Sequence, residues 1–217
     1  MKGKSVPQLL LFPCNGNAVE ALECITNEYE PVGFVDDSPH KQGTIHCGLP
    51  VFSRVAFTKH PKAKVLAVPG SPISYLKRNE IITGLGISPD RFATIIHPRA
   101  TVASLAVIGI NVLIMAGVVI TSNAVIGDHV CILPNTVLHH DVVVGPLTLI
   151  GSNVVVAGNV AIGKNCYIGS GSRIINGVSI GERSLVGMGS TVLDTFPSEV
   201  TLVGSPARQI HRKHGDL

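Results

Sequence analysis

A strict six-residue period organises the second half of this chain of 217 residues. Every sixth residue from Val102 to Val192 is Val, Ile or Leu, without a change of phase. The sixteen members of this aliphatic row are Val102, Ile108, Ile114, Ile120, Ile126, Ile132, Leu138, Val144, Ile150, Val156, Ile162, Ile168, Ile174, Ile180, Val186 and Val192. Such a period fits neither an α-helix nor the alternation of an ordinary strand. It fits a solenoid whose short, flat strands turn a corner every six residues.

Small residues accompany the aliphatic row. Gly follows the aliphatic residue at eight of the sixteen steps, for example at Gly127 and Gly151. We expect these glycines near the corners, where some backbones need a positive φ. A small or β-branched residue often stands four positions after the aliphatic one, as Ala124 and Thr136 do. The aliphatic side chains then point into a narrow core, because branched side chains pack well on a pleated surface.

The first half of the chain alternates short apolar runs with segments of helical spacing. We expect strands at residues 8–12, 32–35 and 64–68, and helices at residues 18–29 and 73–85. Strands that alternate with helices predict a small α/β domain with a parallel sheet. Ligands of such sheets bind beyond the carboxyl ends of the strands. In this chain those ends carry Cys14-Asn15-Gly16-Asn17, Asp36-Asp37 and Pro69-Gly70-Ser71.

These strand-end residues allow two interpretations. The Gly-rich fingerprint of dinucleotide-binding proteins is absent, so Asn15, Gly16 and Asn17 form either a plain turn with a helix N-cap or a ligand contact. Asp36 and Asp37 are either a turn that caps the next segment or two carboxylates that accept hydrogen bonds from a base or a sugar.

His139, His140 and Asp141 place titratable groups inside the repeat. The neighbouring core positions are Leu138 and Val142, so both imidazoles and the carboxylate must point outward. A His that titrates near neutral pH can take the proton from an amine or a hydroxyl that attacks a thioester. A carboxylate close to the imidazole fixes its tautomer and stabilises its charged form.

The hexad stretch resembles the left-handed parallel β-helix of the hexapeptide-repeat acyltransferases, and the left hand is implied by that family. With the α/β half in front of it, the chain resembles the sugar acyltransferases that include bacillosamine-precursor N-acetyltransferase, perosamine N-acetyltransferase and the sialic acid O-acetyltransferase group. We therefore predict an α/β N-terminal Rossmann-like domain at residues 1–95. An all-β left-handed parallel β-helix with a C-terminal tail is predicted at residues 96–217.

The resemblance implies roles for particular residues. In the family, a His followed by Asp or Glu just before an aliphatic-Gly step is the general base, which His140 and Asp141 match ahead of Val144-Gly145. His139 is either a substrate contact or an ordinary surface residue. Asn17 stands where the family commonly has His. The residues implied to bind a nucleotide-linked sugar are Asn15, Gly16, Asn17, Asp36, Asp37, Gly70, Ser71 and Arg78.

Acetyl-CoA is the implied acyl donor, and its pantetheine arm is expected along the β-helix, between two subunits of a homotrimer. By family position, the residues that contact it are Leu149, Gly158, Gly187 and Pro206. Gly158 is placed by the resemblance to offer an N–H to the developing oxyanion.

The main hypothesis is acetyl-CoA-dependent N-acetylation of the amino group of a nucleotide-linked sugar in surface-glycan synthesis, with His140 as the base. The alternatives are O-acetylation of a sugar such as sialic acid and a non-catalytic trimeric β-helix scaffold. We expect no metal, because the zinc-binding enzymes that share the β-helix carry a closely spaced His pair that this chain lacks.

Composition argues against other classes of partner. The formal net charge of +3 does not suggest a nucleic-acid binder. The longest apolar stretch, residues 112–120, is far too short to span a membrane, and the apolar run near the N-terminus is too short for a signal peptide. The five cysteines are scattered without metal spacing, which favours reduced thiols and a cytoplasmic location.

Overall fold

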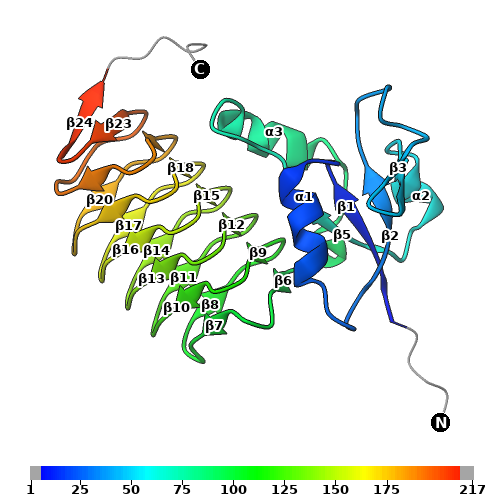
Figure 1. The fold of residues 1–217 in the computed structure, drawn as a ribbon, viewed down its shortest axis with the longest axis horizontal. Coiled ribbons are helices and arrows are strands. Elements are labelled where there is room, and N and C mark those ends of the chain that lie inside the picture. Colours follow the sequence, from blue (N-terminus) through cyan, green and yellow to red (C-terminus); the bar gives the residue numbers. More distant parts are fainter. Residues whose placement is uncertain (1–5, 211–217) are drawn as a thin grey trace.

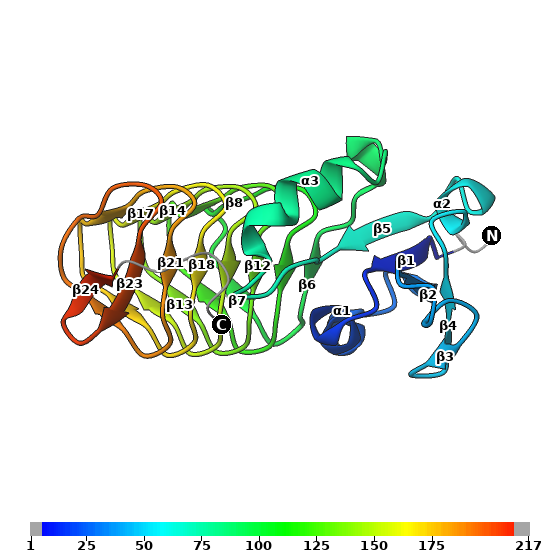
Figure 2. The ribbon, with the colours of Figure 1, turned by 90° about the horizontal axis from the view of Figure 1, so that it is seen from above.

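The computed structural model describes residues 6–210, so the predicted C-terminal tail after residue 210 lies outside the described part. An α/β unit comes first, and a long β-helix continues from it to the end of the described chain (Figure 1). Seen from above, the coils of the β-helix follow one another along a single axis (Figure 2).

The α/β unit is built on a sheet of five strands within residues 6–210, in the order β3-β4-β2-β1-β5. Its strands are β1 (Gln8–Phe12), β2 (Glu30–Val35), β3 (Ile45–His46), β4 (Leu49–Phe52) and β5 (Lys64–Ala67). The strands β4, β2, β1 and β5 are parallel, and β3 is antiparallel to β4. Every residue of β1 from Leu9 to Phe12 is at most 2% exposed, which is typical of a parallel sheet covered on both faces.

The helices of this unit are shorter than the sequence predicts. Its helices are α1 (Gly16–Ala21), α2 (Ala56–Lys59) and α3 (Arg78–Thr83), with 3₁₀ turns at Leu22–Cys24, Tyr75–Lys77 and Pro89–Arg91. The helix predicted at residues 18–29 ends early because Ile25 is already extended, at φ −80° and ψ 122°. The apolar spacing nevertheless identified buried positions, since Val19, Leu22 and Ile25 all pack against the core beneath the sheet.

The β-helix follows the six-residue period of the aliphatic row. Its first strand, β6 (Ile95–Ile96), pairs with β9. Sixteen two-residue strands then lie between residues 101 and 192, and each ends on a member of the row. They are β7 (Thr101–Val102), β8 (Val107–Ile108), β9 (Leu113–Ile114), β10 (Val119–Ile120), β11 (Val125–Ile126), β12 (Cys131–Ile132), β13 (Val137–Leu138), β14 (Val143–Val144), β15 (Leu149–Ile150), β16 (Val155–Val156), β17 (Ala161–Ile162), β18 (Tyr167–Ile168), β19 (Arg173–Ile174), β20 (Ser179–Ile180), β21 (Leu185–Val186) and β22 (Thr191–Val192).

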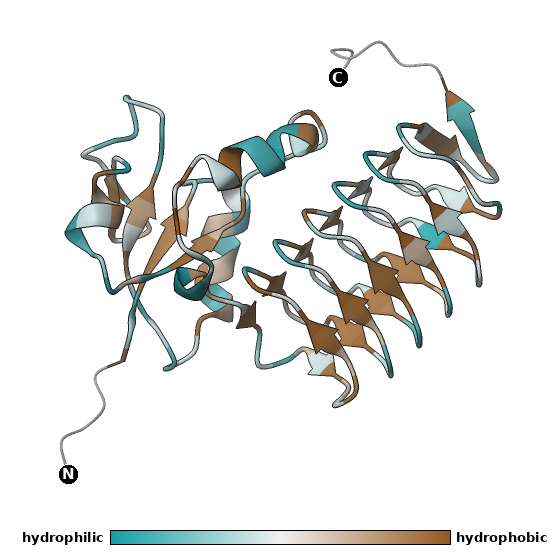
Figure 3. Ribbon diagram, turned by 180° about the vertical axis from the view of Figure 1, so that it is seen from behind, coloured by the Kyte–Doolittle hydropathy of each residue, from teal (hydrophilic) through white to brown (hydrophobic). Residues whose placement is uncertain are grey.

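The strands stack into three sheets within residues 6–210, and every third strand pairs in parallel. An antiparallel hairpin of β23 (Thr201–Gly204) and β24 (Ala207–Ile210) closes the last coil. Fourteen of the sixteen row side chains are at most 2% exposed, and only Val102 and Ile108 in the first coil are partly exposed. The strands of the first coils are brown in Figure 3, whereas several strands of the later coils carry polar residues and are white or teal. The parallel sheets and the repeat fit the left-handed β-helix of the prediction.

The corners correct one expectation about glycine. The glycines that follow the aliphatic row do not have a positive φ; the third residue after the aliphatic one has it instead, as in Asn123 and Asn135. Asn tolerates this left-handed backbone better than most side chains. The row glycines serve close approach between coils: a Cβ on Gly145 would lie 2.5 Å from the backbone N of Lys164 in the next coil.

One edge of the β-helix holds the α/β unit. The side-chain amide of Asn111 accepts a hydrogen bond from Ala67 N at 2.7 Å and donates one to Ala67 O at 2.8 Å, so it extends β5 as a strand would. Further along the same edge, Asn165 donates to Leu76 O at 3.2 Å. No helix within residues 6–210 is long and apolar enough to cross a membrane.

Candidate active site

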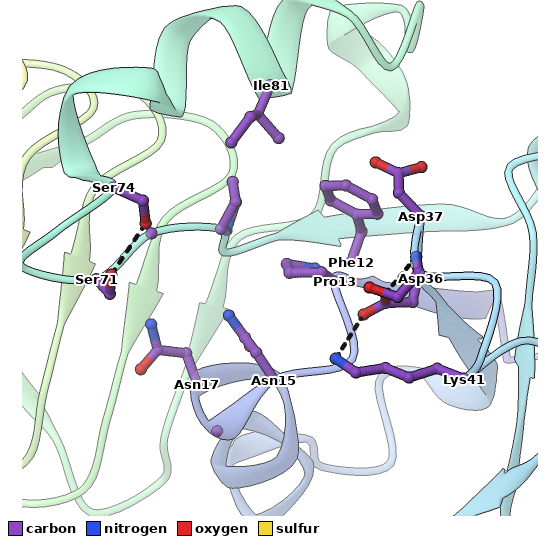
Figure 4. A pocket seen from close by; sticks show the side chains of 14 residues that line it. Phe12, Pro13, Asn15, Asn17, Asp36, Asp37, Lys41, Ser71, Ser74 and Ile81 are labelled. Atoms are coloured by element: carbon purple, nitrogen blue, oxygen red, sulfur yellow. Dashed lines mark hydrogen bonds and ion pairs between the residues drawn. The ribbon is translucent and has the colours of Figure 1, made fainter.

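A cavity of about 520 Å³ opens at the carboxyl ends of β1, β2 and β5 (Figure 4). This is the edge where parallel α/β sheets bind ligands, and the volume is within the usual range for a small-molecule site. Seven of the residues predicted to bind substrate line it: Asn15, Gly16, Asn17, Asp36, Asp37, Gly70 and Ser71. The sequence therefore located this cavity from three separate turns.

Asn15 is committed to the local structure of its turn. Its Oδ1 accepts a hydrogen bond from Ala18 N at 2.9 Å and caps α1, while its Nδ2 donates to Val68 O at 3.2 Å. The N-cap interpretation of this turn is thus confirmed for Asn15. The amide of Asn17 has no such partner among residues 6–210, and it lies in the cavity facing the Ser71 side (Figure 4).

Asp36 is a buried carboxylate at the end of β2, with 3% of its surface exposed. It accepts hydrogen bonds from Cys14 N at 3.0 Å, Ser38 N at 2.9 Å and Lys41 Nζ at 3.1 Å. Burial by itself raises the pKa of Asp36, but the hydrogen bonds from Ser38 and Lys41 outweigh it and hold the pKa below its usual value. Asp36 is therefore ionised at neutral pH and organises the turn around it.

Asp37 pairs with an arginine on the neighbouring loop. Arg54 Nε and Nη2 donate to the two carboxylate oxygens of Asp37 at 2.6 and 2.7 Å, in a fork geometry. Arg54 also donates to Gly84 O at 2.6 Å, and its guanidinium lies 5.7 Å from the centre of the Phe12 ring. The carboxylate of Asp37 remains half-exposed at the cavity.

Arg78 corrects one prediction. Its side chain is fully buried, and its three nitrogens donate to the backbone oxygens of Leu147, Pro69 and His129. Burial lowers the pKa of Arg78 to about 10, which leaves it charged at neutral pH. A side chain with no exposed surface and every nitrogen engaged cannot contact a substrate. Arg78 instead ties the loop after β5 to two coils of the β-helix.

A smaller cavity of about 180 Å³ lies between the α/β unit and the β-helix. The α/β unit contributes Asn17, Gly70, Ser71 and Pro72, and the β-helix contributes Leu133, Leu149, Ile150, Gly151 and Tyr167. Three of these residues, Asn17, Gly70 and Ser71, also line the larger cavity. The two cavities are thus neighbours, and Leu149, which we predicted to contact coenzyme A, faces the smaller one.

His140 and Asp141 occupy an exposed corner between β13 and β14. His140 Nδ1 lies 2.8 Å from Asp141 Oδ2, and half of the His140 side chain is exposed. Asp141 Oδ1 accepts a further hydrogen bond from Asn123 Nδ2 at 3.0 Å, one coil earlier. The hydrogen bond with His140, followed by that from Asn123, holds the pKa of Asp141 below its usual value. The prediction that this pair points outward is confirmed, and Nε2 of His140 is left for another partner.

Gly158 lies against the ring of His140. A Cβ at Gly158 would come within 2.5 Å of His140 Nε2, so only glycine leaves room for the imidazole in this position. His139 is exposed beside the pair. The other residues predicted to contact coenzyme A are elsewhere: Leu149 and Gly187 lie in or directly after strands of the eight-stranded sheet, and Pro206 lies in the turn between β23 and β24. One chain therefore does not bring them next to His140.

Sequence reasoning missed several residues of both regions. Asn123 precedes Asp141 by eighteen residues, or three hexads, so the repeat itself places them in register on adjacent coils. No such signal marks Lys41 in the sequence, because it stands in the loop after β2 and its position at the cavity depends on contacts with Asp36 and with the distant Cys14 O. The remaining lining residues that we did not single out are Phe12, Pro13, Ser38, Ser74 and Ile81.

His129 belongs to the edge that holds the α/β unit. Its Nδ1 lies 3.0 Å from Asn111 Nδ2, and its ring packs edge-on against Phe92. Burial lowers the pKa of His129, and the nearby charge of Arg78 lowers it further. Among residues 6–210, no three His, Cys, Asp or Glu side chains gather as a group that could hold a metal ion.

Comparison with known proteins finds hexapeptide-repeat transferases in both sequence and structure. The family model of the bacterial transferase hexapeptide, described as six repeats, matches residues 105–140, 123–158, 141–176 and 159–194. No curated protein sequence matches the chain. The structure is similar to the acetyltransferase domain of PglB from Neisseria gonorrhoeae in complex with acetyl coenzyme A, at 24% identity and a TM-score of 0.82, over 94% of this chain and 98% of that one.

Two further solved structures share the whole architecture. Perosamine N-acetyltransferase (PerB) from Caulobacter crescentus, in complex with CoA and GDP-perosamine, is 25% identical with a TM-score of 0.80, over 96% of this chain and 99% of that one. WeeI from Acinetobacter baumannii is 23% identical with a TM-score of 0.78, over 94% and 99%. The resemblance predicted from the sequence is thereby confirmed. Residues 105–194 thus match the bacterial transferase hexapeptide family model, and the solved structures share with this chain both the β-helix and the α/β unit in front of it.

Proposed function

We propose that this protein is an acetyl-CoA-dependent N-acetyltransferase that acts on the amino group of a nucleotide-linked sugar in surface-glycan synthesis. The observation that carries the proposal is the exposed His140–Asp141 pair on a hexapeptide β-helix whose α/β unit holds a nucleotide-sized cavity. The similarity to PerB supports the same conclusion, because that enzyme is seen with CoA and GDP-perosamine and matches nearly the whole chain. The parallel strands β2, β1 and β5 support the Rossmann-like description of the α/β unit.

In this proposal His140 is the general base. The neutral amine of the sugar attacks the thioester carbonyl carbon and transfers its proton to His140 Nε2, and the carbon–sulfur bond then breaks. The proton on the imidazolium passes to the departing thiolate, which gives an amide and free coenzyme A. Asp141 holds Nδ1 as the protonated nitrogen and stabilises the imidazolium, and Asn123 holds Asp141. The N–H of Gly158 is proposed to stabilise the developing oxyanion.

The site is proposed to be completed by a neighbouring subunit in a homotrimer. His140 lines neither cavity of its own chain, and the residues assigned to coenzyme A lie on two different parts of the β-helix. The outward valines Val107, Val125 and Val143 of one sheet are 60%, 40% and 45% exposed, whereas the outward Leu113 and Cys131 of another sheet are covered by the α/β unit. A row of exposed valines on stacked strands is suited to contact with another β-helix.

Acetyl transfer from acetyl-CoA to nucleotide-linked amino sugars tests this proposal. General-base catalysis contributes roughly 10²–10⁴-fold, so His140→Asn should lower kcat by about that factor without a change in unfolding temperature. His97→Asn, at an earlier corner of the β-helix, is the matched control and should leave kcat unchanged. Normal turnover of His140→Asn would exclude His140 as the base. Transfer to hydroxyl counterparts instead of amines would indicate an O-acetyltransferase, and a failure to bind acetyl-CoA would indicate a scaffold.

The cytoplasmic location is part of the same proposal. The five cysteines, all within residues 6–210, are free thiols, and four of them are buried. Reduced cysteines are typical of proteins that work in a reducing compartment.

A further inference from the structure

A corner of the β-helix contacts the part of the α/β unit that leads into the two cavities. Ala67 ends β5, and the residues just after it include Gly70 and Ser71, which line both cavities. Asn111 holds Ala67 by the two hydrogen bonds described above. His129 stands eighteen residues after Asn111, at the same corner of the next coil, and its Nδ1 lies 3.0 Å from Asn111 Nδ2. His129 therefore contacts the side chain that anchors β5.

The hydrogen bonds of the Asn111 amide fix the protonation state of His129. Ala67 N can only donate, so it identifies the amide oxygen, and the amide nitrogen must donate both to Ala67 O and to His129. His129 Nδ1 is thus an acceptor, which requires a neutral imidazole with its proton on Nε2. An imidazolium would place a second N–H against the amide N–H. Turning the amide over would relieve that contact, but it would oppose both backbone groups of Ala67 with groups of their own kind.

The surroundings of His129 also disfavour its charged form. The ring packs edge-on against Phe92, with 5.2 Å between the ring centres. The charged groups near it within residues 6–210 are Asp128, from the same corner, and Arg78, from α3. Burial lowers the pKa of His129, the Asp128 carboxylate opposes this shift, and the Arg78 guanidinium adds to it. The net shift is downward, so the imidazole is neutral at neutral pH.

The loop after β5 is packed tightly against the same corner. Arg78 donates to Pro69 O and to His129 O, so it joins the loop to the backbone of the corner residue. Gly70 has a φ of +118°, and a Cβ there would lie 3.0 Å from Leu149 Cδ1 and 3.1 Å from Arg78 Cδ. A shift at this corner is therefore passed to the backbone that lines both cavities.

We propose that His129 is a positioning residue for the loop at residues 68–71, which it holds in place only while its imidazole is neutral. The neutral ring keeps the Asn111 amide on Ala67, and protonation releases the end of β5 together with the loop. His129 lines neither cavity, so it acts through these neighbours. Substrate affinity then falls in acid by a route that is separate from the titration of the general base. The inference rests on the proposed function in taking the larger cavity as the nucleotide site.

Hydrogen exchange of the full chain, measured by mass spectrometry, tests this proposal. The peptide of residues 64–71 contains the N–H that Ala67 donates to Asn111. A group with the ordinary His pKa of 6.5 goes from roughly 10% to roughly 90% protonated between pH 7.5 and pH 5.5, so acid favours the released state by at most about tenfold. After correction for the chemical exchange rate, we expect the protection of this peptide to fall by about three- to tenfold.

Urea separates local release from unfolding of the whole chain. Local release exposes little surface, so 1 M urea at pH 5.5 should accelerate exchange of the 64–71 peptide by less than about twofold. Exchange through global unfolding would be accelerated by about fivefold or more, because the effect of urea scales with the surface that unfolding exposes.

His129→Asn removes the titrating ring, so the protection of the 64–71 peptide should respond to the same pH change by less than about twofold. His97→Asn is the matched control. His97 Nδ1 also accepts a hydrogen bond, from Arg99 N at 2.9 Å, but within its own turn, so this variant should keep the full response. If His129→Asn does not fold, the pH and urea responses of the unmodified protein still decide the question.

Nucleotides connect the effect to the cavity. Calorimetry at pH 7.5 identifies which of GDP, UDP and dTDP binds. A bound nucleotide should restore protection of the 64–71 peptide at pH 5.5, because a ligand shifts the population toward the state that it binds more tightly.

Three outcomes would overturn the proposal. Protection of the 64–71 peptide that does not change with pH would remove the role of His129 while leaving the proposed acetyl transfer intact. A pH response that urea accelerates by about fivefold would assign it to global unfolding. Nucleotide binding that restores no protection would show that the loop does not serve the cavity. Failure of all three nucleotides to bind would contradict the nucleotide-linked substrate of the proposed function, whereas exchange in the free protein would still test His129.

Discussion

At the scale of single residues, the imidazole of His140 packs against Gly158 on the next coil. The ring of His140 lies where a Cβ of Gly158 would be. Gly158→Ala should therefore displace the ring without straining the coil, since the atoms that it meets belong to a side chain that can rotate. Because a shift of about 1 Å in a reacting group can cost roughly 10²-fold, we expect kcat to fall by about 10- to 100-fold with little change in unfolding temperature. An unchanged kcat would show that the ring position does not matter for turnover.

A second residue-scale prediction concerns the pH dependence of stability. Burial holds the pKa of His129 below its ordinary value of 6.5, so the folded protein keeps this side chain neutral. Below about pH 6.5 the unfolded chain takes up a proton that the folded chain resists, and the free energy of unfolding falls as the pH decreases; above that pH His129 contributes nothing. His129→Asn removes the titration and suits the positive φ of this position. Urea unfolding at pH 7.5 and pH 5.5 should show a smaller loss of stability for the variant, and an equal loss would contradict the assignment.

At the scale of the elements, glycine permits the close approach of neighbouring coils at many corners. A Cβ on Gly145 would lie 2.5 Å from the backbone of the next coil, and backbone cannot move aside as a side chain can. Gly145→Ala should destabilise the protein by roughly 1–3 kcal/mol, as overpacking generally does. The control is Gly16→Ala, whose added Cβ meets no atom within 4 Å. Thermal unfolding gives the stability of both variants. Equal unfolding temperatures would show that the neighbouring coils can move apart to accept the added methyl group without a loss of stability.

The elements also show why the sequence predicted some features and not others. The six-residue row predicted the sixteen strands from β7 to β22, because one period governs their core positions, but it did not predict the closing hairpin of β23 and β24. Helix lengths were overestimated, because Val19, Leu22 and Ile25 satisfy helical spacing even where the chain tightens into a 3₁₀ turn. The roles of Arg78 and Lys41 could not be predicted, because each depends on backbone atoms far away in the chain, such as Leu147 O and Cys14 O.

At the scale of the whole molecule, the proposed site is divided between chains. The cavities belong to the α/β unit and its own β-helix, whereas His140 is exposed at a different corner. Mixing two inactive variants, His140→Asn and the cavity-filling Ser71→Trp, should restore measurable acetyl transfer when subunits exchange, because hybrid sites then combine an intact cavity with an intact His140. Light scattering should give three times the chain mass of 22.7 kDa. No recovery of activity after proven exchange would place the complete site within one chain.

The pairing of Asn111 with Ala67 locks the α/β unit to a particular rung of the coiled stem. Successive coils are separated by roughly 4.8 Å, so the distance along the β-helix can change only in whole coils of eighteen residues. Inserting one coil between Asn111 and Asn123 would move the His140–Asp141 pair by one coil spacing relative to the α/β unit. An extra coil after Val192 would leave that distance unchanged. Length variation in such proteins is therefore expected to accumulate at the distal end of the stem.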